Sequence, residues 1–163
     1  MKYFVVLLLA LCVGFYACTK DVGILPQAPP LTDSLLFTYV KDSANQTPYL
    51  STTSQSTFTS DAAHGSKLYK LMVNTKARNS MTDGGKLPVN GSFPDSSLMV
   101  KKLYNTSNQV DFYAVMYKKD GAWKWAEFNA SGTVVKSINS NSDNCISCHA
   151  SDRDRVNTFV VHP

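Results

Sequence analysis

The sequence predicts an α+β protein that is mainly antiparallel β-sheet, with one N-terminal helix and a short helix near the C-terminus. Runs rich in Val, Tyr, Phe and Trp with a two-residue repeat predict four main strands, at 68–73, 97–104, 110–118 and 122–128. Asp120-Gly121 separates the last two runs, and this pair is typical of a tight hairpin turn. Consecutive strands joined by short turns favour a meandering antiparallel sheet.

The other elements are predicted from capping and breaker residues. Thr32-Asp33-Ser34 can begin a helix that runs to about Ala44, with Leu35, Leu36, Tyr39 and Val40 on one side. Residues 45–60 are rich in Ser, Thr and Gln and predict a loop. Residues 78–95 hold three Gly and two Pro and predict a second, longer loop. A short strand is expected at 133–136.

The N-terminus has the pattern of an export signal. Lys2 precedes an apolar run from residue 4 to residue 15, which is too short to span a membrane and long enough for a signal-peptide core. Ala17 followed by Cys18 resembles a bacterial lipobox. We therefore expect a lipoprotein signal peptide at 1–17, with lipid on Cys18. The alternative is simple cleavage near Ala17 that leaves Cys18 as a free thiol.

A proline-rich tether at 18–31 is expected to join the lipid to a single domain at 32–163. The protein would then lie in the bacterial cell envelope, facing the periplasm and anchored to a membrane surface. The net charge of +4 comes without a dense basic cluster, which argues against binding to nucleic acid. With Cys12 in the signal and Cys18 assigned to lipid, only two cysteines remain in the domain.

These two cysteines form the motif Cys145-Ile146-Ser147-Cys148-His149. Cys-x-x-Cys-His places two thiols one helical turn apart, where each can add to a vinyl group of haem, and the adjacent histidine can bind the iron. The motif predicts one covalently attached haem c, with His149 as the metal ligand. Three other interpretations stay open: a thioredoxin-like redox pair, a zinc site completed by a distant His64 or His162, and a local disulfide with an incidental histidine.

A sixth iron ligand would be a methionine or a second histidine. The candidates in the domain are Met72, Met81, Met99, Met116, His64 and His162. Three of the methionines lie in predicted strands, where packing in the core is the expected role. Met81 lies in the predicted loop and is the favoured candidate among them.

Two adjacent lysines occur in the predicted strand 97–104. Alternation along a strand places Lys102 with Val100 on one face and Lys101 with Met99 on the other. Both faces are otherwise apolar. A lysine that is removed from water has a lowered pKa and becomes nucleophilic. The alternative, which the pattern alone favours, is that both amines reach solvent at the strand end.

The order and spacing of these motifs resemble those of the cytochrome P460 family, which includes the cytochromes c′-beta. The resemblance extends over about 64–159 and rests on His64-Gly65, Val73-Asn74, Phe93-Pro94-Asp95, Val100-Lys101-Lys102-Leu103-Tyr104, Tyr113-Ala114-Val115-Met116-Tyr117-Lys118, Gly121-Ala122-Trp123-Lys124-Trp125-Ala126-Glu127-Phe128 and the Cys-x-x-Cys-His motif.

The resemblance implies an antiparallel sheet with flanking helices, a five-coordinate haem bound through His149, and commonly a homodimer. It also implies that Lys101 corresponds to the strand lysine that is bonded to the haem ring in P460 proteins. Lys102 stands where the family pattern often has Glu. Glu127 is the leading candidate for the distal acid, and Asp95 and Arg78 are weaker ones.

Three functions are therefore considered. The first is an oxidoreductase that acts on hydroxylamine or a related small nitrogen species, with Lys101 tuning the haem and Glu127 accepting protons. The second is a c′-beta-like protein that binds nitric oxide or a similar gas without turnover. The third is a simple electron-transfer cytochrome with a sixth ligand. Each requires a redox or gas partner that the sequence does not identify.

Overall fold

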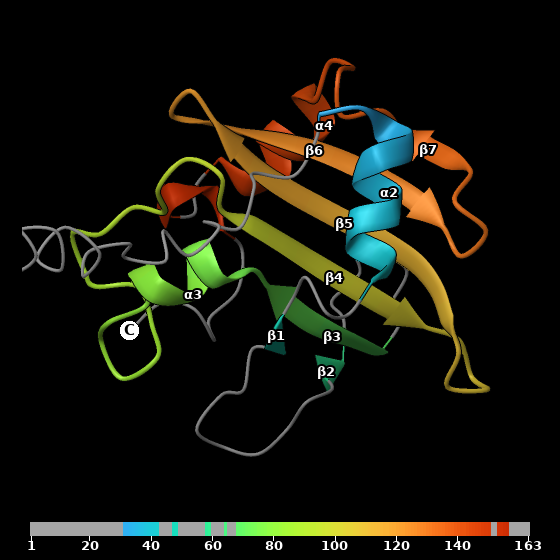
Figure 1. Cartoon of the computed structure of the whole chain (residues 1–163), viewed down its shortest axis with the longest axis horizontal. Helices are drawn as coiled ribbons and strands as arrows, with labels where there is room; N and C mark the ends of the chain where they lie inside the picture. Colours follow the sequence, from blue (N-terminus) through green and yellow to red (C-terminus); the bar gives the residue numbers. More distant parts are fainter. Residues whose placement is uncertain are drawn as a thin grey trace, which may run out of the picture.

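A computed structural model of the chain describes residues 31–42, 47–48, 58–59, 64, 68–150 and 153–156. Within these residues seven strands form one antiparallel sheet, in the order β1-β3-β4-β5-β6-β7, with β2 also paired to β3 (Figure 1). The strands are β1 (Thr47–Pro48), β2 (Phe58–Thr59), β3 (Leu68–Val73), β4 (Leu98–Tyr104), β5 (Val110–Lys119), β6 (Ala122–Asn129) and β7 (Val134–Lys136). The predicted α+β class and the mainly antiparallel sheet are confirmed.

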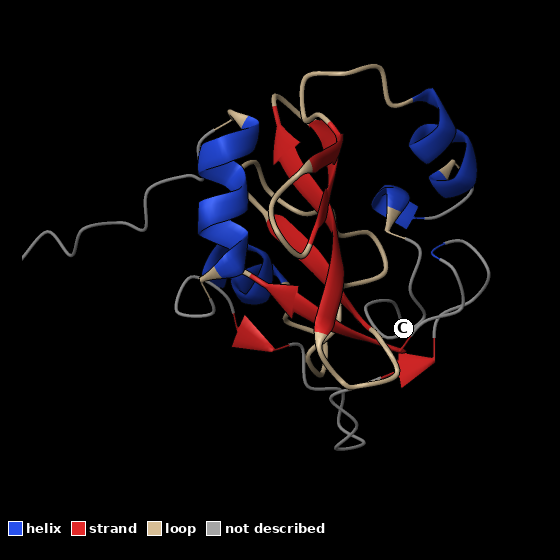
Figure 2. Ribbon diagram, turned by 90° about the vertical axis from the view of Figure 1, so that its right-hand side faces the viewer, coloured by secondary structure: helices blue, strands red, loops and turns tan. Residues whose placement is uncertain are grey.

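Short helices lie on both faces of this sheet. They are α2 (Asp33–Lys41), α3 (Thr75–Ser80), α4 (Asp143–His149) and the 3₁₀ turn η3 (Arg153–Arg155). Figure 2 shows the sheet nearly edge-on, with α2 on one side and α4 on the other. None of the helices in the described residues is long and apolar enough to cross a membrane. The predicted signal peptide and nearly all of the predicted tether lie outside the described residues.

The alternation of side chains along the strands gives the sheet two different faces. On the face covered by α2, Leu36 and Val40 of the helix pack in a buried cluster with strand residues such as Val100, Val115 and Phe128. Phe37 also stacks against this face, with its ring centroid 5.4 Å from that of Phe128. Burial of these apolar side chains supplies most of the stabilisation on this face.

The opposite face carries the second buried cluster. Val73, Met99, Trp123 and Trp125 come from the strands, and Ile146 of α4 packs against them at the edge of the cluster. This face therefore holds the motif helix against the sheet. The sequence position of each strand residue, odd or even, determines which of the two clusters it joins.

The helix predicted from Thr32 is shorter than expected. α2 ends at Lys41 rather than near Ala44, and Leu35 is 54% exposed instead of facing the sheet. The close fit of α2 to the sheet depends on Gly132, whose φ of +92° suits glycine. A side chain at this position would collide with the Phe37 ring. The lack of a Cβ at residue 132 thus lets α2 approach the β6–β7 turn.

The remaining differences from the predicted elements are local. α3 occupies the start of the predicted loop 78–95, and Asn74 caps it by accepting a hydrogen bond from the backbone N–H of Ala77 at 3.0 Å. β1 and β2 lie within the predicted loop 45–60. The Asp120-Gly121 hairpin is confirmed, with φ of 53° and 73° at its two residues, as a tight turn of this type requires.

Candidate functional site

A cavity of about 280 Å³ lies between α4 and the face of the sheet opposite α2. This is close to the lower end of the range of about 300–1,000 Å³ that is usual for small-molecule sites. Its lining residues come from β3 to β7, α4 and two further segments: His64, Leu71, Met99, Lys101, Ala114, Val115, Met116, Trp125, Ala126, Glu127, Lys136, Asn144, Cys145, Cys148, His149 and Val156. We call this face of the sheet the cavity face.

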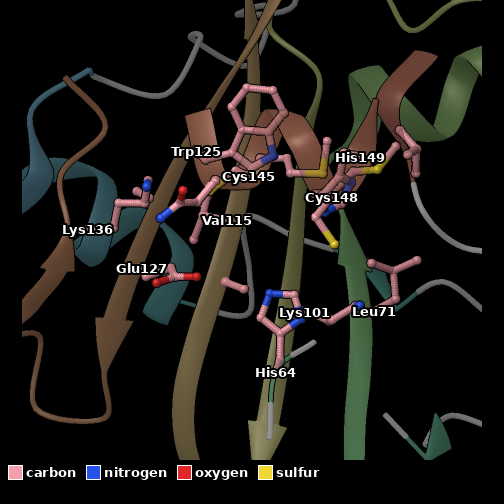
Figure 3. A pocket seen from close by; sticks show the side chains of 16 residues that line it. His64, Leu71, Lys101, Val115, Trp125, Glu127, Lys136, Cys145, Cys148 and His149 are labelled. Carbon is pink, nitrogen blue, oxygen red and sulfur yellow. The ribbon is translucent and has the colours of Figure 1, made fainter. Parts of the chain in front are cut away.

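One row of side chains crosses the cavity face from strand to strand. Leu71 pairs with Lys101, Lys101 with Ala114, Ala114 with Glu127, and Glu127 with Lys136. Because neighbouring strands are about 4.8 Å apart, the backbones of Lys101 and Glu127 lie about 10 Å apart, with the small Ala114 between them. Figure 3 shows Glu127 and Lys136 on one side of the cavity and Lys101 beside His64.

The motif helix α4 forms the other wall of the cavity. Cys145, Cys148 and His149 all line it, and both cysteines are free thiols. Ile146, between the two cysteines, packs against the core cluster of the cavity face. The apolar residue within the Cys-x-x-Cys spacing therefore fixes the helix on the sheet, while the thiols and the imidazole stay available to a bound group.

The ring of His149 is already oriented by the backbone. Its Nδ1 lies 2.7 Å from the carbonyl oxygen of Arg155. A carbonyl oxygen can only accept a hydrogen bond, so Nδ1 carries the proton and Nε2 has the free lone pair. This is the tautomer in which a histidine binds a metal through Nε2, and a partner on the second nitrogen makes the ligand more basic. Trp125 flanks the same ring, with centroids 6.3 Å apart.

The residues around the cavity fit a haem. The indole N–H of Trp125 is buried and makes no hydrogen bond within the described part of the chain, so it is a donor that a bound group can use. Burial raises the pKa of the Cys145 thiol, and the nearby Lys136 opposes this effect. The thiol is therefore protonated at neutral pH.

The other interpretations of the motif receive less support from the described residues. An antiparallel sheet does not provide the βαβ context of a thioredoxin-like redox pair. Among the residues that the structure describes, no three His, Cys, Asp or Glu side chains are grouped so as to hold a metal ion by themselves. His162 lies outside these residues.

A Cys-x-x-Cys-His helix set against a ligand-sized cavity, with the histidine held in the ligating tautomer, defines a haem protein of the c-type cytochrome class. The family model described as Cytochrome P460 matches residues 44–160. Because this match covers more than half of the chain, the chain belongs to the cytochrome P460 family, and its cofactor is a haem. Comparisons with curated proteins and with solved structures gave no match.

The structure brings together the main residues singled out in the sequence. Lys101 and Glu127 both line the cavity, opposite the motif helix. The two weaker candidates for the distal acid do not line it. Asp95 instead accepts a hydrogen bond from the backbone N–H of Gly121 at 2.9 Å, at the β5–β6 turn, and Arg78 lies on α3.

The favoured methionine does not lie at the cavity. Met81 is 5% exposed and belongs to the buried core with Leu87 and Phe93, because it closes α3 instead of lying in an open loop. Met72 lies in the cluster beneath α2. Met99 packs in the core cluster of the cavity face and Met116 packs against it, as expected, and both also line the cavity, as does His64.

Three contributors to the site were missed in the sequence. Lys136 faces Glu127 because β7 pairs back onto β6, and strand alternation across that hairpin could have placed it there. Trp125 was noted only as part of a motif. The carbonyl of Arg155 gives no sequence signal, because any residue has one.

The two lysines of β4 have different surroundings. Lys101 points to the cavity, with its ammonium 4.7 Å from the centre of the Tyr69 ring. Lys102 points to the opposite face, is 7% exposed, and lies 5.9 Å from the centre of the Tyr113 ring. Burial lowers the pKa of Lys102, and the charge of Asp42 opposes this effect. Lys102 is thus the desolvated lysine of the pair, and the expectation that both amines reach solvent is wrong for it.

Replacing Lys102 with Met should raise the free energy of unfolding at pH 7. The lowered pKa means that the folded state disfavours the charged amine, and this cost is fully present below the folded-state pKa. It disappears as the pH rises toward 10.5, the ordinary value for lysine. The advantage of Lys102→Met in urea unfolding should therefore shrink between neutral pH and pH 10.5. An advantage that stays constant over this range would contradict the assignment.

Proposed function

We propose that this protein is an exported, lipid-anchored monohaem c-type cytochrome that oxidises hydroxylamine or a related small nitrogen species. In this proposal Cys145 and Cys148 hold one haem through thioether bonds, and His149 binds its iron. The observation that supports it most directly is the row on the cavity face, where Lys101 and Glu127 face α4 from the two sides of Ala114.

Lys101, Ala114 and Glu127 have separate tasks in the proposed reaction. When bound, the haem supplies an open coordination position and takes up electrons. Lys101 would tune the haem through the bond to its ring that the family resemblance implies. Glu127 accepts the protons that hydroxylamine loses on oxidation. The small side chain of Ala114 leaves room between the two, and apolar neighbours such as Met99 and Met116 exclude water.

A second candidate function has one observation in its favour. Much of the cavity wall is apolar, including Leu71, Met99, Met116 and Val156. A wall of this kind suits a protein that binds nitric oxide or a similar gas without turnover. Lys101, Glu127 and Lys136 are the charged exceptions among the strand residues that line the cavity, and they favour the oxidoreductase.

The location of the protein is part of the proposal. Lipid on Cys18 would hold the domain at a membrane surface of the cell envelope, on the periplasmic side, through the tether 18–31. The unidentified redox partner that removes electrons from the haem would then act at the same surface.

The lysine assignment is tested by the optical spectrum of the ferrous protein. We expect a strongly red-shifted Soret band in the wild type and an ordinary c-type band in Lys101→Ala. Lys102→Met is the matched control, because its side chain lies on the other face of the same strand, and it should keep the wild-type spectrum.

The other spectra would contradict the proposal in different ways. An ordinary five-coordinate spectrum that is the same in wild type and Lys101→Ala would leave gas binding as the better account. A six-coordinate, low-spin spectrum would indicate an electron-transfer cytochrome, with Met99, Met116 or His64 as candidate ligands on the cavity wall.

Glu127→Gln should lower the rate of hydroxylamine oxidation by about 100-fold or more, as expected when a positioned proton acceptor is lost. The Soret band should not change, because the shape of the side chain is retained. Asp120→Asn provides a control in which a carboxylate is removed from the β5–β6 turn, where asparagine accepts the positive φ. Equal rates in Glu127→Gln and wild type would show that another group accepts the protons.

Lipidation is tested by the mass of the N-terminal peptide of the mature protein. We expect this peptide to begin at Cys18 and to carry diacylglycerol, and we expect Cys18→Ser to release the protein from the membrane fraction. A wild-type peptide that carries an unmodified Cys18 would refute the anchor.

A further inference from the structure

The segment that orients His149 is itself held by a buried ion pair. Lys118 of β5 and Asp154 form this pair, with side chains only 7% and 12% exposed. The second carboxylate oxygen of Asp154 accepts a hydrogen bond from the backbone N–H of Phe93 at 2.6 Å. The two partners of Asp154 are 36 and 61 residues distant in the chain. We call Lys118, Asp154 and the N–H of Phe93 the clamp.

The backbone at Asp154 and Arg155 adopts a conformation that needs support from its surroundings. Asp154 and Arg155 have φ of 47° and 56°, which is unfavourable for residues other than glycine. Such residues keep this conformation only when their surroundings fix it. On the far side, Val156 is 2% exposed in the core of the cavity face. The carbonyl of Arg155 thus lies between two fixed residues.

That carbonyl is the group that accepts the hydrogen bond from Nδ1 of His149, at 2.7 Å. A displacement of the segment by a few tenths of an ångström would lengthen this bond. Lys118 is suited to prevent it, because it lies in the central strand β5 and its ammonium is 5.4 Å from the centre of the Trp123 ring. The sheet is therefore connected to the ligating histidine through a charge pair and one carbonyl.

We propose that Asp154 and Lys118 are positioning residues that set the basicity of His149 and so the reduction potential of the haem. A short hydrogen bond to Nδ1 gives the imidazole more anionic character, which favours the ferric state. Loss of the clamp would weaken that bond and favour the ferrous state. The inference rests on the proposed binding of the iron by His149, and not on the Lys101 bond or on turnover.

The test compares the full-length holoprotein with Asp154→Asn, measuring the iron–histidine stretching band by resonance Raman and the midpoint potential by spectroelectrochemistry. Asparagine accepts the positive φ but removes the charge that Lys118 requires. We expect a lower stretching frequency and a more positive potential. Loss of a partner behind a metal ligand should change the relative affinity of His149 for ferric over ferrous iron by about tenfold, at the low end of such effects. A tenfold change corresponds to a shift of about 59 mV in the midpoint potential.

Two further variants separate positioning from simple loss of stability. Lys118→Arg keeps the ion pair and should keep both readouts near the wild-type values. Asp95→Asn removes a different carboxylate, which accepts a hydrogen bond from the backbone N–H of Gly121 at the β5–β6 turn. This variant should leave both readouts unchanged. If Asp154→Asn does not retain haem, the same two quantities are measured on the double variant Lys118→Met, Asp154→Asn, because it leaves no buried unpaired charge.

The outcomes distinguish this proposal from the proposed function. A wild-type protein with an iron–histidine band, together with clamp variants that unfold more easily but keep that band and the potential, would overturn the role of the clamp alone. An equal shift in Asp95→Asn would overturn it as well. A wild-type ferrous protein that is five-coordinate but shows no iron–histidine band would refute the binding of iron by His149, and the role of the clamp with it.

Discussion

The two-residue repeat of side chains along β4, β5 and β6 is the constraint on which the rest of the structure depends. It sends Val100, Val115 and Phe128 toward α2, where they form a closed apolar core. It sends Lys101 and Glu127 to the opposite face, where α4 presents its cysteines and histidine. The face under α2 thus holds a closed core, while the opposite face holds both a second core cluster and the chemistry, and the residues of the two faces alternate along the same strands.

The sequence was a good guide where structure is determined locally. The main strands and the Asp120-Gly121 turn follow from strand propensity and turn chemistry, and the cavity role of Lys101 follows from alternation and family resemblance. α3 was missed because its residues, Thr75–Ser80, carry no apolar repeat, and its start depends on the Asn74 side chain, which also accepts a hydrogen bond from the backbone N–H of Leu98 at 3.1 Å. Met81 was misplaced for the same reason, since it closes that helix and enters the core.

Contacts over long sequence distances account for what could not be predicted in the site. The carbonyl that orients His149 is positioned by partners of Asp154 that lie on β5 and before β4, and no local pattern reports such pairs. The histidine is therefore supported from two directions, by the helix that carries it and by a segment tied to the sheet. A histidine supported in this way has a fixed tautomer and a fixed ring orientation.

The position of one irregularity in the sheet affects how the chain can vary in length. β4 and β5 pair regularly from Leu98 to Leu103, and the register shifts between Leu103 and Tyr104. This bulge lies beyond both lysines, next to the turn at 105–109. Residues gained or lost in that turn can be absorbed there, whereas one residue inserted in β4 before Lys101 would exchange the faces of the two lysines. Related chains should therefore differ in length at the turn and keep the spacing from Leu98 to Lys101.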